Sequence, residues 1–279
     1  MAHDPIAVYK TAMTRVPGYR KFLMEAAGRV PEVASLEDFR KLPFTDKKEY
    51  LTKYPLEEIC LDGTLRGKHM ICRSSGTTQK PFYWPQLPEQ ERETPQWFYA
   101  GLDEAIGVSE KPTLAVVALA LGSWISGELS TWALRSASLD KKNLTLITPG
   151  LNVDEVVTIL ERFCAQYEQT LILSYPPFAK TIVDSALAKG LPVKSYNLRF
   201  RLVGEGYTEH FRDYMAERLG HTERDVSAIW AGYASTDFGR VGTETPLSIM
   251  ARRMVFRKGL ARQVFGKDEM PSLCQFNPD

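Results

Sequence analysis

The sequence carries almost no net charge and no long apolar run. Its 35 Lys and Arg residues balance 34 Asp and Glu residues, which leaves a formal charge of +1. Proteins that bind nucleic acid or anionic membranes electrostatically typically have a basic excess, so neither partner is expected. No stretch reaches the ~18 to 20 consecutive apolar residues that a transmembrane helix needs. The N-terminal residues also lack the basic and then apolar order of a signal peptide, so we expect a cytoplasmic protein.

Cysteine and histidine are scarce and scattered. The chain has four of each, without a C-x-x-C pair or an H-E-x-x-H motif. Those spacings are typical of zinc sites and redox pairs. We therefore expect no structural zinc site, and reduced, packed thiols at Cys60, Cys72, Cys164 and Cys274.

The pattern of apolar residues predicts an α/β protein. Residues up to about Tyr54 show apolar positions at helical spacing, with a break at Pro17-Gly18. From Thr113 onward, short apolar runs alternate with amphipathic stretches of helical length, which indicates a mainly parallel sheet covered by helices. The predicted strands lie at 114–119, 144–147, 171–173, 200–203 and 228–231.

Two of the intervening helices have clear start signals. Asn152 can cap a helix with Glu155 three residues later, and its apolar stripe comprises Val156, Val157, Ile159, Leu160 and Phe163. Thr208 can cap the second helix, which ends at Gly220. Its predicted inward residues are Phe211, Tyr214, Met215 and Leu219.

The most informative segment runs from Arg73 to Pro81. It reads Arg-Ser-Ser-Gly-Thr-Thr-Gln-Lys-Pro, so four hydroxyls, a glycine and a lysine fall within seven positions. Hydroxyls and the N–H groups around Gly76 can donate to phosphate oxygens, and Lys80 adds a mobile charge. It is not a Walker A loop, in which the lysine directly follows the second glycine. An ordinary solvated loop has a similar composition, so both interpretations stay open on composition alone.

This segment resembles the phosphate loop S-S-G-T-T-G-K-P of the adenylate-forming (acyl-activating, AMP-binding) enzymes, in the variant of phenylacetate-CoA ligase-like proteins. Seven of the eight positions match. Upstream, residues 16–20, 36–39 and 42–47 resemble the helical lead-in of these ligases. Downstream, Gly204-Glu205 is similar to their G-E-P stretch beside the adenine, and residues 233–237 are similar to their Y-G-S-T-E motif. The motifs follow the family's order across nearly the whole chain.

The resemblance implies a role for each matching residue. Lys80 and Thr236 would be catalytic, with Lys80 on the leaving pyrophosphate and Thr236 on the α-phosphate, while Asp237 would hold Mg²⁺. The implied nucleotide-binding residues are Ser74, Ser75, Gly76, Thr77, Thr78, Gly204, Glu205, Gly206, Tyr233, Ala234, Ser235 and Thr236. An acyl pocket for an aromatic acid would be bordered by Trp124, Tyr175, Phe178 and Tyr233.

Simpler interpretations exist for the two downstream motifs. Gly204-Glu205-Gly206 is also typical of a plain turn between a strand and a helix. Residues 235–237 could merely cap a turn, since Ser, Thr and Asp are strong caps. Both motifs follow predicted strands, however, and ligands of open α/β sheets collect at the carboxyl ends of the strands.

The implied reaction has two steps. A small carboxylic acid attacks the α-phosphate of Mg·ATP to form an acyl-adenylate and pyrophosphate, and coenzyme A then displaces AMP to form a thioester. ATP, Mg²⁺ and coenzyme A are therefore the expected ligands. The phosphate loop would position the nucleotide and neutralise its charge.

The sequence departs from the family pattern in several places. Gln79 and Ala234 replace glycines, and Asp237 is shorter than the usual glutamate. Residues 238–279 contain no match to the family's ribose-binding aspartate, hinge or C-terminal lysine domain. We therefore expect a helical lead-in over residues 1–54 and a nucleotide-binding core over 55–279, truncated before those segments.

Three alternatives follow from these departures. The chain could be a non-catalytic nucleotide-binding remnant, or a split-gene subunit that needs a separate chain for the C-terminal part; a homodimer is also open. In a remnant or a split-gene subunit, an unpaired terminal strand around residues 270–279 would invite a partner chain. A serine hydrolase fits poorly, because no G-x-S-x-G elbow occurs.

Overall fold

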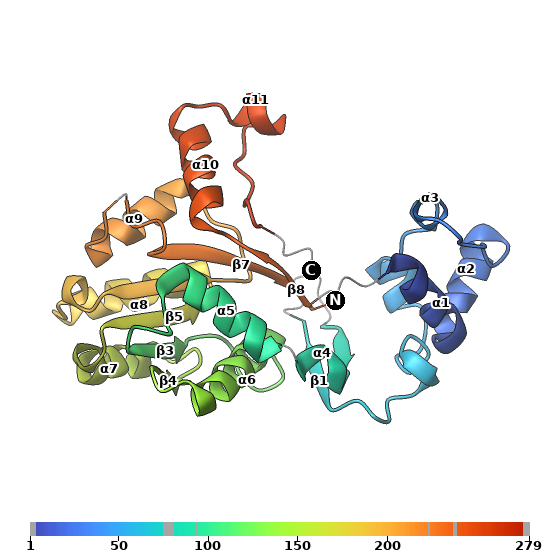
Figure 1. The fold of residues 1–279 in the computed structure, drawn as a ribbon, viewed down its shortest axis with the longest axis horizontal. Helices are drawn as coiled ribbons and strands as arrows, with labels where there is room; N and C mark the ends of the chain where they lie inside the picture. Colours follow the sequence, from blue (N-terminus) through green and yellow to red (C-terminus); the bar gives the residue numbers. More distant parts are fainter. Residues whose placement is uncertain (1–3, 75–80, 93, 223, 237–238, 276–279) are drawn as a thin grey trace. The chain divides into compact units, whose positions relative to one another are not determined.

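The computed structural model describes residues 4–74, 81–92, 94–222, 224–236 and 239–275. These residues form two compact units (Figure 1). The first contains the described residues up to Met70 together with Pro85–Leu87. The second is built on Ile71–Trp84 and Pro88–Asn277. The boundary expected after Tyr54 stays a prediction.

The first unit is helical. Its elements are α1 (Pro5–Arg15), α2 (Pro17–Ala27), α3 (Leu36–Arg40), a π-helical turn (Lys47–Leu51) and a 3₁₀ turn (Leu61–Gly63). Asp4 caps α1 by accepting from the N–H of Ile6, and Gly28 ends α2 in the left-handed conformation. The core of the unit consists of Tyr9, Phe22, Leu23, Val33 and Tyr50.

The second unit contains a six-stranded sheet. In chain order its strands are β3 (Thr113–Val117), β4 (Leu144–Ile147), β5 (Gln169–Ser174), β6 (Leu198–Leu202), β7 (Ile229–Ser235) and β8 (Gly239–Thr243). Their spatial order is β4-β3-β5-β6-β7-β8. All neighbouring pairs are parallel except β7 with β8. The predicted α/β class and the five predicted strands are confirmed.

Helices cover both faces of this sheet (Figure 1). The longer ones are α5 (Thr94–Ile106), α6 (Ile125–Asp140), α7 (Val153–Phe163), α8 (Pro176–Ala188), α9 (Glu209–Leu219) and α10 (Pro246–Arg257). The shorter ones are α4 (Pro88–Arg92) and α11 (Ala261–Phe265), with 3₁₀ turns at Cys164–Gln166 and Val193–Ser195. Buried residues of α7, α8 and α9 share one core cluster with one face of the strands, and those of α5 and α6 share the other.

Alternation along the strands explains the two clusters. In β3, Val116 lies in the cluster with α7 to α9, whereas Ala115 and Val117 lie in the cluster with α5 and α6. Successive side chains of a strand point to opposite faces, so a strand covered on both sides is apolar throughout. All five residues of β3 are buried.

The predicted helix caps are confirmed, with one correction to the apolar stripe. Asn152 accepts from the N–H of Glu155 at 3.1 Å, and Thr208 accepts from the N–H of Phe211 at 3.2 Å. Gly220 ends α9 in the left-handed conformation. Phe163, however, is 39% exposed. The buried stripe continues instead to Cys164, four residues after Leu160, so Phe163 falls at the margin of the buried face.

The structure also corrects two expectations about the last strands of the sheet, namely where β7 ends and whether the segment before the C-terminus is paired. Residues 233–235 were expected to follow a strand, but β7 continues through Ser235 because β8 pairs with it. The segment before the C-terminus was expected to be unpaired. Instead, Gln275 exchanges two backbone hydrogen bonds with Thr243 of β8, at 2.8 and 3.2 Å.

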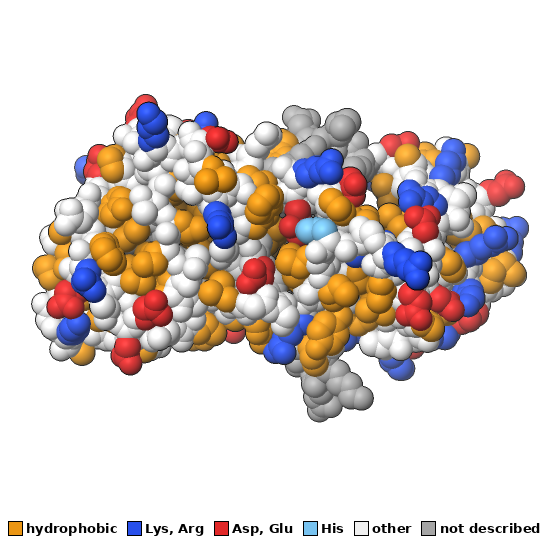
Figure 2. Space-filling view, turned by 90° about the horizontal axis from the view of Figure 1, so that it is seen from below, with side chains coloured by type: hydrophobic (Ala, Val, Ile, Leu, Met, Phe, Trp, Pro, Cys, Tyr) orange, Lys and Arg blue, Asp and Glu red, His pale blue; other side chains and the backbone are white. Residues whose placement is uncertain are grey.

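One face of the molecule shows charges of both signs (Figure 2). On the face that Figure 2 shows, Lys and Arg side chains are interspersed with Asp and Glu, and apolar groups lie between them. None of the helices in the described part of the chain combines the length and apolarity that crossing a membrane requires.

Candidate functional site

The residues that follow the parallel strands lie at one edge of the sheet, which we call the carboxyl edge. Trp124 comes after β3, Tyr175 after β5, and Gly204 after β6. The second half of β7 extends past β6, since the last pair between these strands is Leu202 with Ala231. The predicted placement of both downstream motifs at this edge follows from the parallel order of the strands.

The base of the predicted phosphate loop is tied to this edge. Strand β1 (Met70–Arg73) pairs with β2 (Tyr83–Gln86), and the N–H of Ser74 donates to the Phe82 carbonyl at 3.0 Å. The N–H of Arg73 donates to the Ser123 carbonyl at 2.8 Å. Its guanidinium stacks over the Trp124 ring at 4.0 Å. Of the predicted loop residues, Ser74 is therefore placed beside the β3–α6 connection, whereas Ser75, Gly76, Thr77, Thr78 and Lys80 lie outside the described residues.

The segment 204–206 is an exposed turn at the same edge. Gly204 has φ +88°, a conformation that side chains with a Cβ rarely adopt. A Cβ at Gly204 would lie 3.9 Å from the Cβ of Tyr175. The turn thus lies against the residue that follows the neighbouring strand, with Glu205 and Gly206 exposed.

Residues 232–235 form the part of β7 that extends beyond β6, and we call them, together with Thr236 that follows the strand, the β7 overhang. Tyr233 is 56% exposed, Ala234 is exposed, and Ser235 and Thr236 are half-buried. The pairing with β8 shifts register between Tyr233 and Ala234. Such a bulge re-aims the side chains that follow it. Asp237 lies outside the described residues.

The four predicted acyl-pocket residues have different surroundings. The Tyr175 and Phe178 rings stack with their centroids 5.9 Å apart, and Phe178 of α8 is buried in the core. Trp124 packs on Arg73 instead. The structure thus joins one pair of the four, and the acyl pocket stays a prediction.

We compared the chain with known proteins. No protein-family model matches it, and neither does any curated protein. Among solved structures it is similar to 2-hydroxyisobutyryl-CoA ligase. Against the open conformation in complex with 2-HIB-AMP and CoA, the TM-score is 0.65 at 18% identity, covering 87% of this chain and 51% of that one. The chain has the fold of the N-terminal portion of an adenylate-forming ligase.

Two further structures of that CoA ligase give the same result. The thioesterification state with 2-HIB-AMP and CoA gives a TM-score of 0.63 at 18% identity, covering 87% of this chain and 50% of that one. The postadenylation state with R3-HIB-AMP gives 0.64 at 17% identity, covering 88% and 50%. This chain therefore spans about half the length of the ligase it matches, and the predicted fold-level resemblance is confirmed.

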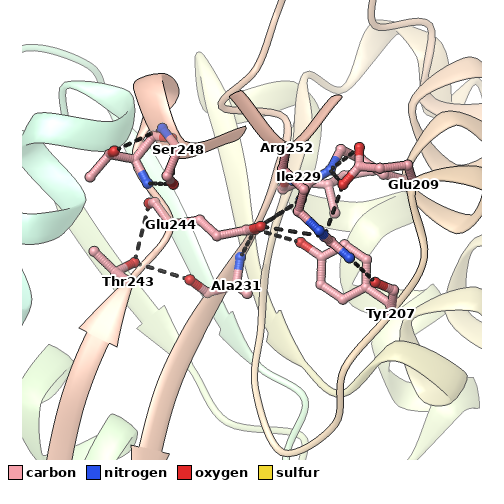
Figure 3. A network of polar contacts seen from close by, with 10 residues as sticks. Tyr207, Glu209, Ile229, Ala231, Thr243, Glu244, Ser248 and Arg252 are labelled. Carbon is pink, nitrogen blue, oxygen red and sulfur yellow. Dashed lines mark hydrogen bonds and ion pairs between the residues drawn. The ribbon is translucent and has the colours of Figure 1, made fainter. Parts of the chain in front are cut away.

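Directly beneath the carboxyl edge, the ligase fold of this chain contains a buried ionic network (Figure 3). Arg212 of α9 bonds to the Glu209 carboxylate at 3.1 Å and to the Glu244 carboxylate at 2.8 Å. Arg252 of α10 lies 2.8 Å from Glu209 and 3.5 Å from Glu244. The Tyr207 hydroxyl donates to Glu244 at 2.9 Å. Two cations and two anions thus compensate one another.

The electrostatics of the network follow from its burial. Desolvation, with the Glu244 charge beside it, raises the pKa of Tyr207 well above its ordinary value of 10.0. Burial alone would lower the pKa of Arg212, but the carboxylates of Glu244 and Glu209 outweigh this effect and the pKa is raised overall. Tyr207 therefore stays protonated and Arg212 stays charged throughout the physiological pH range.

Sequence reasoning missed these residues, although α9 carried a signal. Arg212 lies three residues before Met215 and seven before Leu219, on the face that was predicted to point inward. A charged residue on a buried helix face indicates a buried partner. Glu244 gave no such signal, because its partners are distant in sequence.

The described residues contain no group of three or more His, Cys, Asp or Glu side chains that could hold a metal ion. The four cysteines are free. Burial raises the pKa of Cys72 and of Cys164 to about 11, which suits packed thiols rather than nucleophiles or ligands.

Proposed function

We propose that this chain provides the nucleotide-binding part of an AMP-forming acid–CoA ligase. It would bind ATP for the activation of a carboxylic acid as an acyl-adenylate, which coenzyme A then converts into a thioester. One observation carries the proposal: Ser74, the turn 204–206 and the β7 overhang converge on the carboxyl edge of one parallel sheet. The solved structures that share its fold contain an acyl-adenylate and CoA.

The proposed roles follow the resemblance of the motifs. Lys80, with Thr77 and Thr78, would neutralise the leaving pyrophosphate, and Thr236 would contact the α-phosphate. Tyr233, which is exposed on the β7 overhang, would stack near the adenine. Catalysis in such a site rests on positioning and on charge stabilisation.

Magnesium would enter this site together with the nucleotide. Mg²⁺ is usually held by one or two carboxylates while phosphate oxygens and water fill its other positions. We propose that Asp237 supplies the carboxylate, beside the Thr236 hydroxyl.

We propose an aromatic carboxylic acid, of the phenylacetate kind, as the substrate. Support comes from the stacked pair Tyr175 and Phe178, of which Tyr175 lies next to Gly204, with Trp124 on the β3–α6 connection and Tyr233 on the β7 overhang of the same edge. A separate chain for the C-terminal part, or a second copy of this chain, and a cytoplasmic location belong to the same proposal. The comparisons give no support to the non-catalytic alternative.

The first test is calorimetric titration of Mg·ATP into the wild type, Lys80→Ala and Lys189→Ala. Lys189 is a matched control, because it is also a lysine of the α/β unit but pairs with Glu161 at 2.6 Å on the side of the sheet remote from the carboxyl edge. We expect saturable binding in the wild type and in Lys189→Ala, and its loss in Lys80→Ala. Equal affinity in all three proteins would show that residues 74–81 are not a phosphate site.

The acid is tested by exchange of labelled pyrophosphate into ATP. We expect exchange to depend on added phenylacetate and to be weaker with a short aliphatic acid. Equal exchange with both acids would contradict the aromatic assignment while leaving the nucleotide site intact.

A further inference from the structure

Strand β7 changes neighbours at Ala231. Up to this residue it pairs in parallel with β6, and from Gly232 onward it pairs in antiparallel fashion with β8. The last backbone pair between β6 and β7 is at Ala231. The position of the β7 overhang therefore depends on its pairing with β8 and on the bonds that hold the chain at Ala231.

Glu244 holds Ala231 from two sides (Figure 3). Its carboxylate accepts from the Ala231 N–H at 2.7 Å, and its own N–H donates to the Ala231 carbonyl at 2.8 Å. The Thr243 hydroxyl donates to the same carbonyl at 3.1 Å. Both polar backbone groups of Ala231 are thus hydrogen-bonded by the last residue of β8 and the residue that follows it.

The same network also holds the turn 204–206, because Tyr207 directly follows Gly206. The Tyr207 hydroxyl donates to Glu244 at 2.9 Å, and the Tyr207 carbonyl accepts from Arg252 at 2.6 Å. Tyr207 is therefore held at its side chain and at its backbone. One carboxylate links the start of the overhang to the end of the turn.

We propose that Glu244, supported by Arg212 and Arg252, is a positioning residue that sets the turn 204–206 and the β7 overhang at a fixed separation for a purine nucleotide. The nucleotide part of this inference rests on the proposed function. The positioning itself is a property of the protein without ligand, so it can be tested separately.

The chemistry of the network supports positioning rather than simple stabilisation. Burying charges costs desolvation energy, and apolar residues of similar volume often stabilise a core equally well. Apolar packing, however, is not directional, whereas a carboxylate with two oxygens fixes the direction of each donor. Glu244 accepts from Arg212, Arg252, Tyr207 and Ala231. A glutamine amide cannot replace the Glu244 carboxylate, because the NH₂ group of the amide would face one of these donors.

The test uses Glu244→Gln and the milder Tyr207→Phe, which removes a single hydroxyl from the network and keeps the ring. The matched control is Asp225→Asn, which makes the same kind of change in an ion pair with Arg199 at the start of β6. Two quantities are measured on each protein: hydrogen exchange of backbone amides without ligand, and the affinity for Mg·ATP. The control corrects for any general loss of stability.

We expect exchange in residues 204–206 and 232–236 to rise about tenfold in Glu244→Gln and less in Tyr207→Phe, with β3 and β5 unchanged. The affinity for Mg·ATP should fall about tenfold in Glu244→Gln and about threefold in Tyr207→Phe. It should stay at the wild-type value in Asp225→Asn. Unchanged exchange in both segments, or an equal rise in Asp225→Asn, would overturn the positioning role. If the wild type binds no nucleotide, the proposed function fails, and the exchange data still decide the positioning.

Discussion

The two ends of the parallel sheet are each held by an ion cluster, and the clusters differ in their contact with water. At the carboxyl edge, the side chains of Glu209, Arg212, Glu244 and Arg252 are at most 2% exposed. At the amino end, Arg199 and Asp225 form a bidentate pair at 3.0 and 3.1 Å, with side chains 13% and 28% exposed.

The difference shows how burial changes what an ion pair contributes. A partly exposed partner left alone can be hydrated, so the loss of its mate costs little. A fully buried partner left alone keeps its desolvation cost without compensation. The amino-end pair therefore adds modest stability, while the carboxyl-edge network makes the geometry beneath the candidate site strongly dependent on each of its members.

The largest expected effect comes from Arg212→Met. It leaves Glu209 and Glu244 buried with only Arg252 to neutralise them, so the free energy of unfolding should fall by about 3 to 5 kcal/mol. Urea denaturation monitored by circular dichroism measures this loss. The matched change Arg199→Met at the amino end should cost only about 1 to 2 kcal/mol. Equal losses in the two variants would remove the distinction between the two ends.

An intermediate effect is expected from Gly127→Ala near the start of α6. A Cβ at Gly127 would lie 2.0 Å from the Ala120 carbonyl oxygen, so the connection after β3 must shift. We expect a loss of about 1 to 3 kcal/mol. Gly101→Ala within α5 is the control, because no atom lies within 4 Å of its added Cβ. Gly101→Ala should raise the free energy of unfolding by about 0.5 to 1 kcal/mol. Thermal melting should therefore show a higher midpoint for Gly101→Ala and a lower one for Gly127→Ala than for the wild type.

The smallest effect concerns pH and the amino end. Hydrogen bonds from His221 and Arg199 lower the pKa of Asp225 below its ordinary 3.8, against the opposing effect of burial. The unfolded chain then takes up the proton more readily, so this stabilisation is complete above pH 3.8 and is lost as the pH falls below it. The free energy of unfolding of the wild type should exceed that of Asp225→Asn by about 1 kcal/mol at pH 5. This difference should become smaller below pH 3.8. A gap that is constant with pH would contradict the assigned cause.

The strands and helices that the sequence predicted well are those with strong local patterns. β3 and β5 are buried along their whole length, and Asn152 and Thr208 carry their own capping amide or hydroxyl. Local sequence patterns did not predict which strands and segments pair with one another. The continuation of β7 through Ser235 depends on β8, and the pairing of Gln275 depends on Thr243.

The candidate site shows the same division. The hydroxyls of residues 74–78 and the glycines at 204 and 206 could be found from composition, order and resemblance. Arg73 over Trp124, and Glu244 beneath Ala231, could not be found in that way. Their partners lie 51 and 13 residues away, respectively, in segments without a shared motif.

The sequence by itself determined the α/β class, the succession of its elements and the motifs proposed as the nucleotide site, because each depends on side chains that are close along the chain. Only the tertiary structure decided that Ser74 lies beside the β3–α6 connection at the edge where the two downstream motifs were expected, and that Glu244 links those two motifs. Parallel strands bring their carboxyl ends together irrespective of sequence distance. A buried carboxylate finds its compensating charges wherever the fold places them.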